Sequence, residues 1–285
     1  DQSYQGIVDY SVDRYGARAE FLKVGANFDP QVGFRRRWDF NRAWGQLRFS
    51  PRPADMTRVR KYTFTTSGEY VEGGGGVVET RIVDGHFDAE LANSDRVSID
   101  AQRDYEFLRQ PFTPSGSPTP IPAGGYTFDD VTVSYAFGAQ RRASGTVAVK
   151  VGEFYDGKIR SVTIGPGGLA SGRISLLTRL AVEPTFSVTR VERSAGSFTT
   201  RISRARVDYA FTPLMFTSAL LQYSSADRAF GTNIRFRWEY APGSELFLVY
   251  TDERDTTDDR FATPTTVRGL KNRAFVVKVN RLFRY

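Results

Sequence analysis

The chain of 285 residues contains no cysteine, one histidine and two methionines. The lack of cysteine excludes disulfide frameworks, zinc–thiolate sites and thiol catalysis. The sequence also lacks any run of ~18 apolar residues, and this excludes a transmembrane helix. A strand needs only about 10 residues of alternating polarity to cross a membrane. A membrane-spanning sheet is therefore compatible with the low apolar content.

Long runs of one charge are absent too, although the formal net charge is +7. Lys and Arg are scattered singly through alternating segments, which argues against nucleic acid as a partner. A basic pore lining, or acidic lipopolysaccharide beside the protein, explains this scatter better. The acidic segment from Asp252 to Asp259 could collect calcium, but it lacks the glycine-spaced pattern of a dedicated loop. We expect a solvated loop there, and no metal or cofactor.

What the sequence does contain is alternation of polar and apolar residues with a period of two. In residues 232–240, every second residue is large and apolar, and the residues between are polar or charged. Successive side chains of a strand point to opposite faces, so such a segment separates an apolar from a polar environment. Residues 130–137, 147–151 and 204–211 repeat the pattern.

These segments predict an all-β fold: one antiparallel, meandering transmembrane β-barrel of about 14–16 strands, in the outer membrane of a Gram-negative bacterium. The barrel would occupy residues 1–285, as a mature chain or as a fragment that lacks N-terminal strands or an N-terminal module. A soluble all-β sandwich is the rival interpretation. It would have to explain why the polar faces are rich in arginine while the apolar faces end in aromatic residues.

The alternation assigns side chains to the two faces of the expected barrel. The lipid-facing set is Ile234, Phe236, Trp238, Tyr240, Phe275, Val277 and Val279. The basic residues expected to line the lumen are Arg204, Arg206, Arg235, Arg237 and Lys278. An excess of inward arginine lowers the barrier for anions, so an open lumen would pass small anionic solutes. Networks of ion pairs that stabilise the barrel explain these arginines nearly as well.

The connections are expected to alternate in length, as in barrels with short turns on one side and long loops on the other. Tight links lie at 211–213 and 241–244, and longer polar links at 73–76, 111–125 and 252–271. The segment from Pro111 to Gly125 could plug the lumen. A plugged barrel that serves as an assembly platform for an unknown partner protein is therefore a further alternative.

The chain ends in a strand expected from Asn272 to Tyr285. Its aromatic end, with Phe283 and Tyr285 on one face, resembles the C-terminal signature that the outer-membrane insertion machinery reads. Arg281 departs from this signature because it falls on the apolar face. Near a membrane edge its guanidinium could reach water.

Six segments of the chain carry a resemblance to a known family. They are Val24–Phe34, Ser50–Pro53, Phe154–Gly157, Ser197–Thr200, Pro242–Phe247 and Asn280–Tyr285. Together they resemble an uncharacterised family of barrel domains, which usually follow an N-terminal module similar to family-9 carbohydrate-binding domains. The resemblance implies a barrel and no particular activity, and a glycan role of that module does not transfer to this chain.

The one candidate for catalysis is His86, which shares a strand face with Asp84 and Asp88. Such a row could hold a general base, and an omptin-like or phospholipase-like hydrolase is the alternative function. A solvated polar face explains the row better, and we expect no enzyme. Trp38 and the adjacent arginines 35–37 could stack on a glycan or nucleic acid, but anchoring at the membrane interface is simpler.

Overall fold

A computed structural model describes residues 2–29, 37–165, 174–177, 179–256 and 269–283. Within these residues all regular secondary structure is β-strand, which confirms the predicted all-β class. The described residues contain no helix that is long and apolar enough to span a membrane. The strands are β1 (Ser3–Ser11), β2 (Tyr15–Val24), β3 (Phe40–Phe49), β4 (Val59–Gly73), β5 (Val77–Leu91), β6 (Arg96–Leu108), β7 (Gly124–Phe137), β8 (Gly145–Phe154), β9 (Gly157–Gly165), β10 (Ile174–Leu177), β11 (Leu180–Arg193), β12 (Gly196–Thr212), β13 (Met215–Ser224), β14 (Ala229–Ala241), β15 (Ser244–Asp255) and β16 (Leu270–Asn280).

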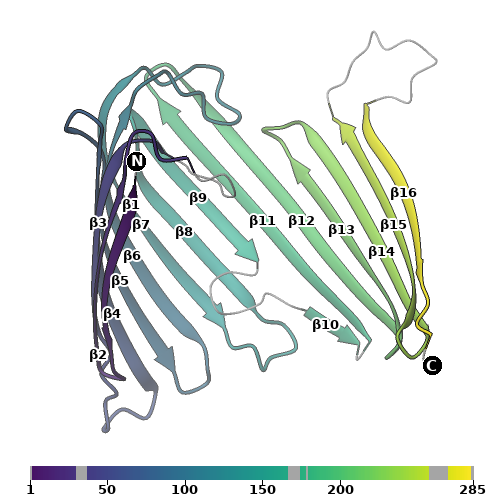
Figure 1. The fold of residues 1–285 in the computed structure, drawn as a ribbon. Helices are drawn as coiled ribbons and strands as arrows, with labels where there is room; N and C mark the ends of the chain where they lie inside the picture. The colour runs from purple at the N-terminus through teal and green to yellow at the C-terminus, as the bar shows by residue number, and fades with distance from the viewer. Residues whose placement is uncertain (1, 30–36, 166–173, 178, 257–268, 284–285) are drawn as a thin grey trace. The chain divides into compact units, whose positions relative to one another are not determined.

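The strand order follows the sequence. All sixteen strands belong to one sheet, whose main path follows the sequence except that β9 bonds directly to β11, while β10 pairs with β11 off this path (Figure 1). Pairing is antiparallel from β1 to β6 and again from β12 to β16. The predicted antiparallel meander is therefore confirmed, with a strand number inside the expected range.

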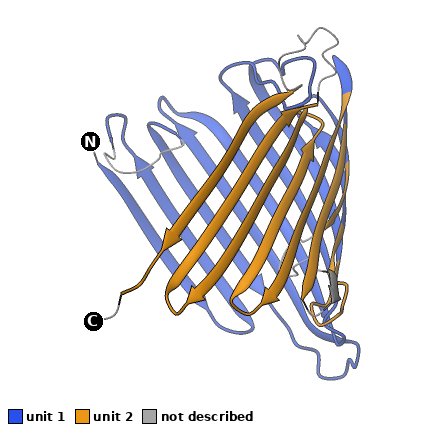
Figure 2. Cartoon of the chain, turned by 90° about the vertical axis from the view of Figure 1, so that its right-hand side faces the viewer, with its two compact units in different colours: residues 1–135, 148–160, 191–197 blue, residues 136–147, 161–190, 198–285 orange. Residues whose placement is uncertain are grey.

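The chain divides into two compact units (Figure 2). Unit 1 comprises residues 1–135, 148–160 and 191–197, and it contains the whole of β1 to β6. Unit 2 comprises residues 136–147, 161–190 and 198–285, and it contains β13 to β16 and nearly all of β12. Each unit is a stretch of sheet with its own apolar and polar faces.

The described part of the chain has almost no hydrophobic core. Its buried apolar residues are six, and its buried polar or charged residues are seven. Soluble domains bury most of their large apolar side chains in a close-packed interior. This chain instead leaves many of its large apolar side chains exposed. The six buried apolar residues are Val24, Val71, Ala89, Ile121, Ala181 and Val191.

Connection lengths agree only in part with the expected asymmetry. In unit 2, the turns 213–214 and 242–243 are tight as predicted, and 256–269 is long. In unit 1, the glycine-rich link after β4 is only the three-residue turn 74–76. Long links such as 50–58 and 109–123 lie at opposite strand ends there, because they follow β3 and β6. The prediction of one short-turn side is therefore wrong for unit 1.

The last strand is shorter than expected. It begins at Leu270 and ends at Asn280, so the prediction of a strand that continues through Phe283 is wrong. The reason is the length of its partner: Asn280 pairs with Glu245, one residue from the start of β15. Beyond it the chain turns away, and the Leu282 amide donates to the Ser244 hydroxyl at 3.0 Å. Tyr285 lies outside the described residues.

Candidate functional site

The apolar face of unit 2 unites the side chains that were expected to face lipid. Residues that pair directly across antiparallel strands share a face. Phe275, Val277 and Val279 of this face are 65%, 54% and 63% exposed. Tyr240 continues the face at its end, with its ring 6.0 Å from that of Trp238. The rows across β14, β15 and β16 are Ile234–Tyr250–Phe275, Phe236–Leu248–Val277 and Trp238–Leu246–Val279.

The apolar face of unit 1 carries an aromatic row that crosses four strands, β2 to β5. Tyr15, Phe49, Phe64 and Phe87 pair in register. Successive ring centroids are 5.4, 6.3 and 5.1 Å apart. Rows of aromatic side chains at the edges of an apolar band are typical of transmembrane barrels. The sequence analysis did not single out these residues, because the row forms only through pairing across strands.

Beside the aromatic row, the same face carries several glycines among large apolar residues such as Leu47 and Val83. Gly45 and Gly68 pair directly, and each borders a hollow of about 570 Å³. None of Gly45, Gly68 and Gly85 has a positive φ. An added Cβ would meet its nearest neighbour only at 3.9 Å at the first two and nothing within 4 Å at the third. Neither backbone conformation nor packing within the chain therefore requires glycine at these positions.

The polar face of unit 2 holds all five basic residues that were expected to line a lumen. Register places Arg204, Arg206, Arg235, Arg237 and Lys278 on the face opposite the large apolar rows. Two of these arginines have carboxylate partners: Arg206 pairs with Asp208 at 3.1 Å, and Arg237 pairs with Glu245. Arg235 instead donates from Nε to the Asn233 amide oxygen at 2.9 Å. Within the described residues, this face therefore combines basic side chains with and without a carboxylate partner.

The polar face of unit 1 is acidic where β5 and β6 meet. Most of its carboxylates bind neutral donors. Asp104 accepts from Gln102 at 2.8 Å, and Asp88 accepts from Ser98 at 3.1 Å. Asp88 also has a cationic neighbour, Arg96, at 3.4 Å. The acidic residues that share this face of β5 and β6 are Asp84, Asp88, Glu90, Asp100, Asp104 and Glu106.

His86 lies in this acidic region, but its bonding differs from the expected row. Its Nδ1 is 2.5 Å from Asp100 on the neighbouring strand. Asp84 accepts a hydrogen bond from Ser67 on the other side. Within the described residues, His86 has no other hydrogen bond. The structure therefore assembles a cross-strand His–Asp pair, and it brings no hydroxyl nucleophile into hydrogen-bond contact with His86.

The connection 109–123, which was considered as a plug, is a folded loop docked on the strand ends of unit 1. Phe112 and Ile121 form a β-bridge with N···O distances of 2.9 and 2.7 Å, and Ile121 is fully buried. The loop is held by Arg193, whose side chain is 1% exposed. Its guanidinium donates to the carbonyl oxygens of Thr119 and Pro120 at 2.9 and 3.1 Å.

Arg193 also binds the turn between β8 and β9. Its Nε and Nη2 donate to the two carboxylate oxygens of Asp156 at 2.7 and 3.2 Å. This bidentate hydrogen bond holds the pKa of Asp156 below its usual value. The neighbouring Tyr155 hydroxyl donates to Glu106 at 2.5 Å, and burial together with this bond raises the Tyr155 pKa. One arginine thus joins a loop and a turn from distant parts of the sequence.

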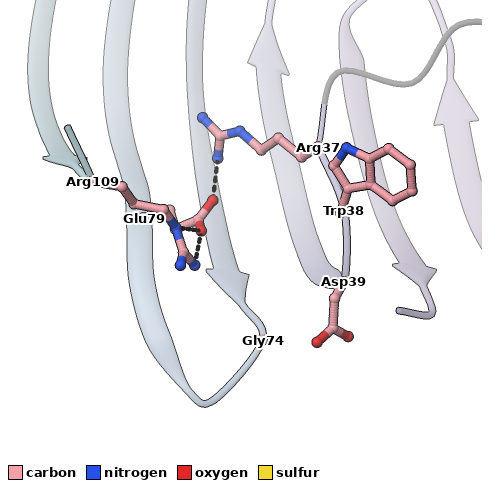
Figure 3. A pocket seen from close by; sticks show the side chains of 6 residues that line it. All are labelled: Arg37, Trp38, Asp39, Gly74, Glu79 and Arg109. Carbon is pink, nitrogen blue, oxygen red and sulfur yellow. Dashed lines mark hydrogen bonds and ion pairs between the residues drawn. The ribbon is translucent and has the colours of Figure 1, made fainter. Parts of the chain in front are cut away.

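A polar pocket lies at the ends of β3, β4 and β6 in unit 1 (Figure 3). Arg37 and Arg109 reach Glu79 from opposite sides. Arg109 donates twice to Oε1 of Glu79, and Arg37 Nη1 is 3.5 Å from Oε2. A side chain at Gly73 would collide with the Glu79 carboxylate, so glycine makes room for this cluster. The pocket has a volume of about 430 Å³.

Sequence reasoning missed both arginine clusters. Arg37 stood out only as the end of a short basic stretch, whose residues 35 and 36 lie outside the described residues. Nothing in the sequence links it to Arg109, or Arg193 to Asp156, because strand pairing alone brings them together. No family model and no curated protein matches this chain. Membership in the resembling barrel-domain family stays a prediction.

Proposed function

We propose that the chain forms a closed β-barrel in the outer membrane and conducts small polar solutes. The observation that carries the proposal is the division of both units into an exposed apolar face and a charged face. A sheet with these two faces fits an environment with lipid on the apolar side and water on the charged side, as in a transmembrane barrel. In this orientation lipids, including lipopolysaccharide, are the partners of the apolar face.

Closure follows from the hydrogen-bond needs of the backbone. An open sheet edge leaves N–H and C=O groups unpaired, and hydrocarbon offers them no partner. In a closed barrel every strand is paired and the charged faces surround a lumen. The aromatic C-terminal end, including Phe283, fits delivery by the outer-membrane insertion machinery.

The ion preference of the proposed pore depends on two sets of charged side chains of opposite sign. The basic set around Arg204 and Arg235 attracts anions, as the sequence predicted. The acidic set around Asp84 and Asp100 attracts cations, and it emerges only from the register of β5 and β6. We propose a weakly selective pore in which these two sets act in opposite directions.

Planar-bilayer recording of the purified full chain tests this function. Stepwise conductance with a reversal potential near zero in a salt gradient is the expected result, because the two sets offset each other. A chain that inserts into the bilayer but never conducts would refute the channel. That result would favour the plugged barrel that serves as a platform for another protein.

A further inference from the structure

The Arg37–Glu79–Arg109 cluster carries more positive charge than its own carboxylate balances. Two guanidinium groups share one carboxylate, so these three side chains have a net charge of +1, and Asp39 supplies the second carboxylate of the pocket. The sharing is unequal, because Oε1 of Glu79 accepts both bonds from Arg109. Arg37 Nη1 is buried and makes no hydrogen bond within the described residues. Its other terminal nitrogen donates to the Thr80 hydroxyl at 2.8 Å, which fixes the guanidinium in place.

Arg37 Nη1 has only a long ion pair, at 3.5 Å from Oε2 of Glu79, and a buried donor without a hydrogen bond is stabilised by a closer acceptor. Arg109 keeps 57% of its side chain exposed, so its outer N–H groups face solvent at the pocket. Forked guanidinium donors match the geometry of phosphate and carboxylate oxygens. A phosphate group suits two arginines that approach from different connections, before β3 and after β6, because it presents acceptors in several directions.

The mouth of the pocket adds a second kind of contact. Asp39 is exposed, and a side chain at Gly74 would collide with its carboxylate. A carboxylate accepts hydrogen bonds from hydroxyl groups and disfavours a bare anion. The Trp38 indole points away from Glu79 in Figure 3, and the proposed site does not use it.

From this geometry we infer that the pocket binds a phosphate ester whose carrier bears hydroxyl groups, with the phosphate at Arg37 and Arg109 and the hydroxyls at Asp39. The phosphate could belong to a lipid headgroup such as that of lipopolysaccharide, or to a free sugar phosphate. The binding chemistry is the same in both cases. The inference is independent of whether the chain conducts.

Titration calorimetry of the detergent-solubilised full chain tests this site with glucose 1-phosphate and inorganic phosphate as probes. Glucose 1-phosphate should bind saturably and more tightly than phosphate, because only the ester offers sugar hydroxyls to Asp39 while its phosphate is bound by the arginines. Arg37→Gln and Arg109→Gln should each weaken it about tenfold or more, since each removes a charged hydrogen bond. The matched control is Arg52→Gln, which removes an arginine paired with Asp13 at 2.7 Å at the opposite strand ends.

Glu79→Gln separates ligand binding from a purely structural ion cluster. Removal of the competing carboxylate should tighten binding of glucose 1-phosphate if the arginines serve a phosphate. Weaker binding in this variant, unchanged affinity in Arg37→Gln and Arg109→Gln, or no saturable binding by the folded chain would overturn the inference. Unaltered circular dichroism verifies folding of each variant.

The two sources are distinguished with micelles of lipopolysaccharide and of enzymatically dephosphorylated lipopolysaccharide. Tighter binding to intact lipopolysaccharide than to glucose 1-phosphate, lost on dephosphorylation and on Arg37→Gln, assigns the site to the lipid. The reverse order of affinities assigns it to a soluble phosphate ester.

Discussion

Strands β2–β6 of unit 1 and β13–β16 of unit 2 show the same alternation of apolar and polar residues, but they carry different side chains. Both have an apolar and a polar face, set by period-two alternation. The apolar face of unit 2 is built of large residues such as Phe236 and Val277, whereas that of unit 1 has Gly45 and Gly68 at its centre. The polar faces also differ: unit 1 has an acidic set where β5 and β6 meet, whereas unit 2 carries a basic set on β12 and β14 that includes Arg204 and Arg235. The alternation of polar and apolar residues therefore determines that each sheet has two faces. The size and charge of the side chains determine how the faces of the two units differ.

The strongest test of this comparison is a charge placed on each apolar face. Val277→Arg in unit 2 and Val83→Arg in unit 1 should each destabilise the folded protein in lipid by about 2–4 kcal/mol if the site lies near the bilayer midplane. The polar-face controls Thr251→Arg and Gln102→Arg should be nearly neutral. Urea titrations in lipid vesicles, followed by tryptophan fluorescence, measure the difference. Equal tolerance of Val83→Arg and Gln102→Arg would mean that the glycine-rich face does not contact lipid.

The next effect concerns the docked loop, which only unit 1 displays among the described residues. Asp156→Asn should destabilise the loop 109–123 by about 3 kcal/mol, because it leaves the buried Arg193 without its carboxylate. Protease cleavage within the loop should accelerate in this variant. Arg52→Gln, which removes an exposed arginine, serves as the control. An unchanged cleavage rate would show that Arg193 does not hold the loop.

The same contact has a defined pH dependence. The folded-state pKa of Asp156 lies below its ordinary value, so its stabilising contribution is complete above that ordinary value. The contribution falls as the pH drops through the folded-state pKa. The loop should therefore resist acid-tolerant proteases at pH 5 to 7 and yield only below about pH 4. Release of the loop between pH 5 and 7 would contradict the lowered pKa.

A smaller effect is expected on ion preference. Neutralising Arg204 and Arg235 with glutamine should shift the reversal potential toward cations, because both belong to the basic set. Asp84→Asn with Asp100→Asn should shift it toward anions. Bilayer recordings in a tenfold salt gradient measure both shifts. Shifts of the same sign in both variants would refute the proposal that the basic and acidic sets act on ion preference in opposite directions.

The smallest effect is expected for His86→Ala. Its partially exposed pair with Asp100 stabilises the fold by about 0–1 kcal/mol, so the variant should fold and conduct like the wild type. Peptide and phospholipid hydrolysis assays on both proteins provide the functional readout. Hydrolysis by the wild type that disappears in the variant would establish the alternative function of an outer-membrane hydrolase.

The sequence predicted the features that depend on local alternation. The face assignments of Phe236, Val277 and Arg235 follow from a period of two, and the register confirms that each set shares a face. The prediction that the last strand continues to Tyr285 was wrong for Phe283, because the end of β16 depends on where its partner β15 begins. The cross-strand contacts could not be predicted. Pairs such as His86–Asp100 and Arg193–Asp156 depend on register and turn length, which composition does not specify.

The central claim is that the two units, each with an apolar and a polar face, form a membrane-embedded barrel. Refolding of the urea-unfolded chain with and without lipid vesicles tests this claim most directly. Samples are then run unboiled on a gel that contains dodecyl sulfate. With vesicles, the protein should migrate faster than after boiling, as a compact barrel that resists the detergent, and without them it should not fold. A monodisperse, folded protein in buffer that contains neither detergent nor lipid would contradict the account.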